Sequence, residues 1–298
     1  PPAPPPPPPY RVGAYSLAGI QKMLDGSRPP TVLDSTGAVR YGRFDTLSGQ
    51  VANLTAGRLK SVFAETFADM TAASLRLSET VGSALDTVVL QSTRWTDTNG
   101  DGRVNSQDTS APHSCTTGLC KSFQQVAKVI AARDVLQEER QVFYLEQTGF
   151  DTHASALDGV RTRMEAQNAA LTAFVDELKL RGVWNDTVIM TASDFARTLD
   201  SNGAGTDHAW GGNYLLLGGG VRGGTIYGKY PTSFLDTSDV AVGRGRFMPT
   251  TSWEGVWHAL GEWFGVTLQE MASVVPNLAN FNRSSEVFGM ADLFTTAT

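Results

Sequence analysis

Gly149-Phe-Asp-Thr-His153 opens the stretch that decides the fold; Thr191-Ala-Ser-Asp-Phe-Ala-Arg-Thr198 and Gly205-Thr-Asp-His-Ala-Trp-Gly-Gly-Asn213 follow it. Apolar runs typical of strands lie at 141–146 and 187–191, just before the first two motifs. Between them, apolar residues at helical spacing predict a long helix over 157–178, which Gly182 closes. Strand, helix and strand in about 50 residues form a βαβ unit, so the stretch predicts a parallel sheet.

Carboxylates and imidazoles stand where these strands end. Two of the four histidines lie beside an aspartate, and α/β proteins place ligands at the carboxyl ends of their strands. Each motif alone also fits a local role, as a helix N-cap or as a turn with a side chain bonded to the backbone. Together they favour a shared polar site of the kind that binds a divalent metal, Zn²⁺ or Mn²⁺. Its candidate members are Asp151, His153, Asp194, Asp207 and His208.

The remaining apolar pattern predicts mostly helices. Helical spacing over 47–90 indicates two helices with a break near residues 56 and 57, and another helix runs from Phe123 to about Glu138. The continuous apolar run within 141–146 predicts a central, buried strand. A tryptophan-rich helix is expected over 252–264.

Composition excludes two classes of partner. The 298 residues carry a net charge of −6 and contain no basic run, so a nucleic-acid partner is not expected. No apolar run approaches the ~18 residues that a membrane-spanning helix needs, so no span is expected.

Residues 97–108 match the calcium-binding loop of an EF-hand position by position. Oxygen-bearing residues occupy loop positions 1, 3 and 5, Gly102 occupies position 6, and a carboxylate closes the loop at position 12. The closing aspartate, in place of the usual glutamate, resembles the loops of extracellular dockerin modules. The alternative is an ordinary polar turn. The predicted Ca²⁺ ligands are Asp97, Asn99, Asp101, the Arg103 carbonyl group, Asn105 and Asp108.

Cysteine usage and sequons point to an extracellular or cell-surface protein. Cys115 and Cys120 are the two cysteines, and a disulfide between them is favoured over two buried thiols. Asn-x-Ser/Thr sequons at Asn53, Asn185 and Asn282 are candidate glycosylation sites, each weak alone.

The run from Pro1 to Pro9 holds eight prolines and predicts a polyproline II segment over residues 1–11. One interpretation is a stiff linker. The other is a segment that docks on a neighbouring protein subunit or carries glycans.

From about Val12 to Phe294 the chain resembles the C-terminal two-thirds of secreted proteins that carry the domain of unknown function 1501. That family belongs to the alkaline phosphatase and sulfatase-like superfamily. The resemblance implies one doubly wound, mainly parallel α/β domain over 12–298, flanked by helices. The predicted calcium loop and disulfide indicate an insertion over 92–122. The resemblance also implies that Asp151 and His153 supply one metal half-site, with Asp194 as the strand-end acid and Asp207-His208 as the later histidine-bearing turn. The motifs that carry it are Tyr15-Ser-Leu-Ala-Gly19, Gly149–His153, Thr191–Thr198, Gly205–Gly212, Gly218-Gly-Gly-Val221 and Pro249-Thr250.

Two departures from the superfamily pattern bear on function. The superfamily's Ser or Thr nucleophile and its first metal-binding acid lie N-terminal to anything in this sequence, and Phe195 stands where classical members carry a histidine. These departures, with the calcium loop, the disulfide and the proline run, favour a structural or assembly role for an extracellular calcium-binding glycoprotein. The alternative is a metal-dependent hydrolase of phosphate or sulfate esters whose nucleophile lies on the N-terminal part.

Overall fold

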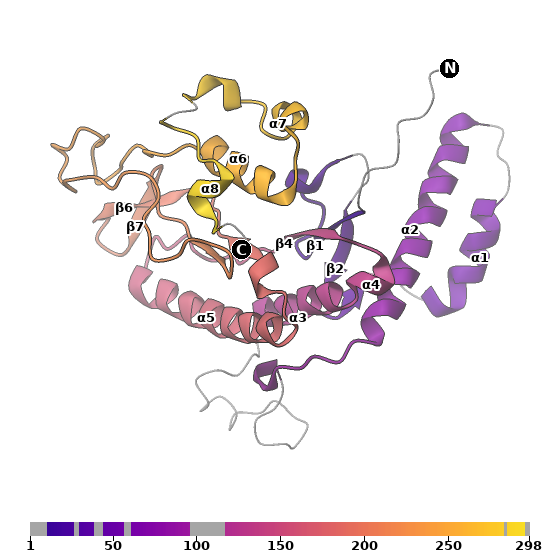
Figure 1. Ribbon diagram of the computed structural model, residues 1–298. Coiled ribbons are helices and arrows are strands. Elements are labelled where there is room, and N and C mark those ends of the chain that lie inside the picture. The colour runs from indigo at the N-terminus through magenta and orange to yellow at the C-terminus, as the bar shows by residue number, and fades with distance from the viewer. Residues whose placement is uncertain are drawn as a thin grey trace. The chain divides into compact units, whose positions relative to one another are not determined.

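The computed structural model describes residues 11–26, 30–38, 44–56, 61–95, 117–282 and 285–295. The predicted proline segment and calcium loop lie outside these residues. The chain divides into two compact units (Figure 1). The first unit takes residues up to Thr148 together with Glu165–Arg181, and the second takes Gly149–Met164 and the chain from Gly182 onward. The sequence predicts that both units belong to a single domain over 12–298, and this stays a prediction.

The first unit contains a four-stranded sheet with the order β3-β2-β1-β4. Strand β1 is parallel to β2 and to β4, whereas β2 and β3 are antiparallel. The bounds are Val12–Ser16 for β1, Thr31–Asp34 for β2, Gly37–Ala38 for β3 and Arg140–Tyr144 for β4.

The prediction of a central, buried strand at 141–146 is wrong, because β4 lies at the edge of this sheet. Val142 on this strand is exposed, while Phe143 stacks on Tyr15 with ring centroids 5.5 Å apart. Only one face of β4 is therefore packed, and the apolar run is too short to tell an edge strand from a central one.

Four α-helices that belong wholly to the first unit accompany this sheet among the described residues. Helices α1 and α2 lie side by side, and the first ends at Ala56, as predicted from the break in the apolar pattern (Figure 1). The bounds are Phe44–Ala56 for α1, Val62–Asp86 for α2, Gly118–Ala131 for α3 and Arg133–Leu136 for α4. Buried side chains around α2, α3 and α4 pack with the sheet in one core cluster: Tyr15, Leu33, Val81, Ala84, Leu85, Val129, Ala132 and Leu136.

A fully buried carboxylate, Glu177, fixes the segment that follows α2. Its oxygens accept hydrogen bonds from the backbone N–H groups of Gln91 and Ser92, at distances down to 2.9 and 2.7 Å. They also accept from Nε1 of Trp95 at 3.0 Å and from Nε of Arg181 at 2.6 Å. A buried charge is stable only when it is paired and hydrogen-bonded, and Glu177 meets both conditions.

Glu177 belongs to α5, Ala156–Leu180, which is the long helix predicted from the apolar spacing. The chain leaves it through Gly182, whose φ of 71° is in the left-handed region that glycine adopts readily. The first turns of α5 belong to the second unit and its last turns to the first unit.

The second unit is built from two short antiparallel strand pairs and a group of helices. Strand β5, Val188–Met190, pairs with β8, Leu216–Gly218, and β6, Ala196–Ser201, pairs with β7, Thr206–Ala209. The helices are α6 at Trp253–Phe264, α7 at Leu268–Val274 and α8 at Met290–Leu293. Side chains of α6 and α8 pack with β5 and β8, around Ala259, Leu260, Leu293 and Phe294.

The fold is therefore mixed α/β, with parallel and antiparallel strands and flanking helices. The parallel sheet predicted from the strand–helix–strand pattern is present in part: β1 is parallel to β2 and β4, whereas β5 pairs antiparallel with β8. No helix among the described residues is both long and apolar enough to cross a membrane.

Candidate metal centre

The β6–β7 hairpin supplies part of the candidate site. Arg197 on β6 lies directly opposite His208 on β7. Because side chains alternate along a strand, Thr206 shares one face of the hairpin with His208, and its hydroxyl oxygen accepts a hydrogen bond from Nε of Arg197 at 3.0 Å. Thr198 points to the opposite, buried face, where its hydroxyl accepts from the Asp207 N–H at 3.0 Å.

The Asp151–His153 turn lies against this hairpin through backbone contacts. The N–H of Thr206 donates to the Thr152 carbonyl at 3.2 Å, and the N–H of Ser155 donates to the Ala204 carbonyl at 2.9 Å. The Asn202 amide also donates to the His153 carbonyl at 3.2 Å. Main-chain hydrogen bonds and the Asn202 side chain therefore hold the two segments together.

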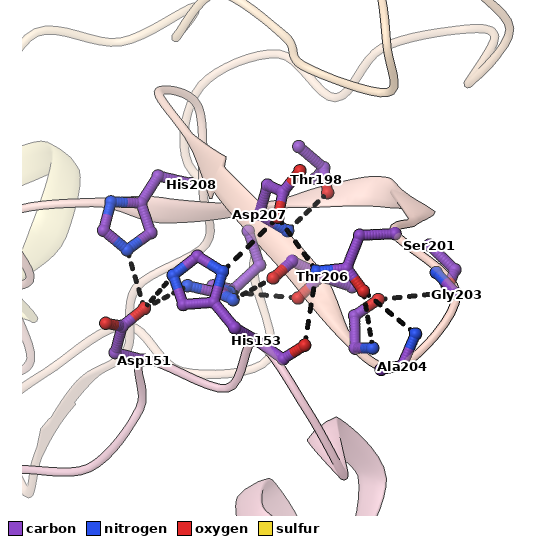
Figure 2. A network of polar contacts seen from close by, with 12 residues as sticks. Asp151, His153, Thr198, Ser201, Gly203, Ala204, Thr206, Asp207 and His208 are labelled. Carbon is purple, nitrogen blue, oxygen red and sulfur yellow. Dashed lines mark hydrogen bonds and ion pairs between the residues drawn. The ribbon is translucent and has the colours of Figure 1, made fainter.

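Three potential metal ligands converge between these segments (Figure 2). Oδ1 of Asp151 lies 2.8 Å from Nε2 of His153 and 2.7 Å from Nε2 of His208. The three side chains offer ligand atoms that all lie within 4.8 Å of one another. Each side chain is about half exposed, so the cluster is open to solvent.

A second carboxylate, Asp207, holds the far side of His153. Oδ1 of Asp207 lies 3.3 Å from Nδ1 of His153, so the other ring nitrogen, Nε2, is the one that faces Asp151 (Figure 2). Asp207 itself accepts from Nδ2 of Asn202 at 2.9 Å and from Nη2 of Arg244 at 3.1 Å. This is the arrangement of an outer carboxylate that orients a metal-binding histidine.

Both carboxylates are stabilised in the charged form. The hydrogen bond with His208 holds the pKa of Asp151 below its ordinary value, and Arg197, whose Nη1 lies 2.9 Å from Oδ1, adds to this effect. The hydrogen bond from Asn202 lowers the pKa of Asp207, with His153 and Arg244 contributing. Imidazole nitrogens beside a charged carboxylate are the ligand types that suit Zn²⁺ or Mn²⁺.

Four of the five candidate residues thus come together: Asp151, His153, Asp207 and His208. Asp194 is exposed and does not join the described cluster. It lies near Tyr214, whose pKa is raised by burial and by the negative charge of Asp194.

Sequence reasoning missed the arginines of this site. Arg197 and Arg244 were not among the candidates, yet both pair with its carboxylates. The position of Arg197 opposite His208 could have been found only by recognising the hairpin, because nothing in the local residue pattern marks the pairing.

The other predicted sites fall partly outside the described residues. All six predicted calcium ligands and Cys115 lie outside them, so the calcium ion and the disulfide stay predictions. Cys120 is fully buried in the first turn of α3, which Thr117 caps. Asn53, Asn185 and Asn282 are all exposed, as glycosylation requires, but sugar on them also stays a prediction.

The described residues define an α/β protein with an exposed Asp–His cluster of metal-binding type. The family model "Protein of unknown function (DUF1501)" matches residues 26–245, which include the whole cluster. The match covers well over half of the chain, and the chain belongs to this family. No match was found among curated proteins or among solved structures.

Proposed function

We propose that Asp151, His153 and His208 bind a divalent metal ion and that the protein is a metal-dependent hydrolase of phosphate or sulfate esters. The observation that carries this proposal is the convergence of the two Nε2 atoms on Oδ1 of Asp151, at 2.8 and 2.7 Å. Two imidazoles and one carboxylate supply three ligands and leave further coordination positions open, as catalytic metal sites do.

The charges around the cluster suit an anionic ester. A bound metal ion would act as a Lewis acid on an ester oxygen. Arg244 pairs with Asp207 through Nη2 while its side chain stays 73% exposed, so its guanidinium group can also contact an anion. Arg197 is more enclosed and holds Asp151 in place. The proposal takes the attacking hydroxyl from a Ser or Thr of a preceding segment, as in the superfamily that the sequence resembles.

The test is an esterase screen on the intact protein with aryl phosphates and aryl sulfates. The protein is stripped with a chelator and then supplied with Zn²⁺, Mn²⁺ or Ca²⁺, and the bound metal is counted by mass spectrometry. We expect turnover that depends on Zn²⁺ or Mn²⁺ and is lost in His153→Ala. The matched control is Asp158→Asn, at an exposed position at the start of α5. Metal binding without turnover on any ester would contradict the hydrolase and leave the metal site standing.

A second candidate is the structural role of an extracellular calcium-binding glycoprotein that uses a hydrolase-like scaffold for assembly. One observation favours it: among the described residues, no Ser, Thr or Cys side chain contacts Asp151, His153 or His208 through a hydrogen bond. In this role, the run from Pro1 to Pro9 would contact a neighbouring subunit. The supporting result is the absence of turnover together with cross-links from this run to another protein subunit.

A further inference from the structure

The two histidines of the cluster are held in different ways. His153 is fixed at both ring nitrogens, by Asp151 at Nε2 and by Asp207 at Nδ1. The hydrogen bonds among the described residues hold His208 at Nε2 alone, through Asp151. An imidazole fixed at one nitrogen can still turn about its side-chain bonds, so another contact must set the plane of the His208 ring.

Phe195 supplies that contact. Its ring stacks on the His208 ring with centroids 4.3 Å apart and planes inclined by only 11°. The hairpin explains why they meet: Arg197 lies opposite His208, and Phe195, two residues earlier, falls on the same face and diagonal to His208.

The Phe195 ring is itself held from two directions. The Ser193 hydroxyl donates to the Phe195 carbonyl at 2.9 Å and accepts from its N–H at 3.4 Å, which fixes the backbone just before β6. The guanidinium carbon of Arg197 lies 5.7 Å from the ring centroid, within the range of a cation–π contact. Phe195 is therefore a fixed surface for His208 rather than a loose apolar side chain.

We propose that Phe195 is a positioning residue that keeps Nε2 of His208 directed at the metal position next to Asp151. This inference rests on the proposed metal site. It gives a role to the one motif position where the sequence carries a phenylalanine in place of the superfamily's histidine: the residue orients a neighbouring ligand instead of binding metal itself.

The test is a set of Zn²⁺ titrations of the intact protein against a chromophoric chelator, with calcium in excess. Phe195→Leu keeps an apolar side chain but removes the flat ring, and it should weaken Zn²⁺ binding by about tenfold or more, the usual effect of losing an outer contact of a metal ligand. Phe195→Tyr keeps the ring and should bind as the wild type does. Trp210→Leu is the matched control, because it removes an exposed ring just after β7.

Two further measurements separate positioning from folding and from failure of the metal site. The absorption spectrum of bound Co²⁺ should change in Phe195→Leu and not in Phe195→Tyr, and the metal-free variants should melt at the same temperature. If Phe195→Leu binds Zn²⁺ as tightly as the wild type, the inference is wrong although the metal site stands. If the wild type binds neither Zn²⁺ nor Co²⁺, the proposed metal site fails and the inference fails with it.

Discussion

Gly205 lies directly against the carbonyl group of Thr152. A Cβ atom at residue 205 would overlap the Thr152 carbonyl oxygen and the backbone carbonyl of His153. The next residue, Thr206, donates its N–H to the same Thr152 oxygen at 3.2 Å. The absence of a side chain at Gly205 therefore allows the hairpin that carries Asp207 and His208 to reach the turn that carries Asp151 and His153.

Gly205→Ala should push these two segments apart. The obstacles are main-chain atoms, which cannot rotate away, so we expect a loss of about 1–3 kcal/mol in the free energy of unfolding, as for other overpacked sites. Zn²⁺ binding should weaken as well, because the ligands lie on both sides of the contact. Chemical denaturation and metal titration check the two effects. Gly223→Ala is the control, since nothing lies within 4 Å of the added Cβ, and equal behaviour of the two variants would contradict the prediction.

Asp207→Asn should weaken metal binding with little effect on folding. The substitution keeps the size of the side chain but removes the charge that holds Nδ1 of His153 and pairs with Arg244. We expect a loss of about tenfold in Zn²⁺ affinity, since outer carboxylates commonly contribute this much. Asp239→Asn, at an exposed position outside the cluster, should leave the affinity unchanged. A complete loss of Zn²⁺ binding in Asp207→Asn would instead indicate that Asp207 binds the metal directly.

The sequence predicts the helices of this protein better than its strands. The apolar patterns over α1, α2, α5 and α6 predict helices where the structure has them, and the breaks at Ala56 and Gly182 follow from local chemistry. Strand partners depend on segments far apart in the chain. The edge position of β4 and the antiparallel pairing of β5 with β8 could not be deduced from the local pattern.

The same distinction holds within the candidate site. Asp151, His153, Asp207 and His208 are visible as polar residues beside glycines and strand-like runs. Arg197 and Phe195 act through their register against His208, which exists only once the β6–β7 hairpin has formed. The hairpin was missed because β6 has the sequence Ala-Arg-Thr-Leu-Asp-Ser, which lacks a continuous apolar run.

Glu177→Gln should destabilise the first unit strongly. Four donors surround this fully buried carboxylate, and an amide group would turn an N–H toward at least one of them. Breaking a buried ion pair costs about 3–5 kcal/mol, and denaturation curves should show a loss of this order. Asp176→Asn is the neighbouring control: Asp176 is 41% exposed and accepts from the Ser92 hydroxyl, so its loss should cost about 1 kcal/mol or less.

Residues 97–108 should bind one calcium ion. Isothermal titration of the chelator-treated protein should show a calcium site that Asp97→Ala abolishes, while His153→Ala leaves it intact. Calcium should raise the melting temperature of the wild type, because a ligand that binds only the folded state stabilises it. A wild type that takes up no calcium at millimolar concentration would contradict the loop assignment.

Cys115 and Cys120 should be found joined. Mass spectrometry of the unreduced protein should show a loss of about two daltons relative to the reduced protein, as expected for one disulfide. Ready labelling of either thiol in the native, unreduced protein would contradict the pairing.

The buried Glu177 has a consequence for the predicted calcium loop. It ties down the backbone up to Trp95, while Thr117 starts a new helix with its own cap, so residues 95 and 117 are each held by contacts among described residues. The predicted calcium loop therefore joins the first unit between two fixed points of its backbone.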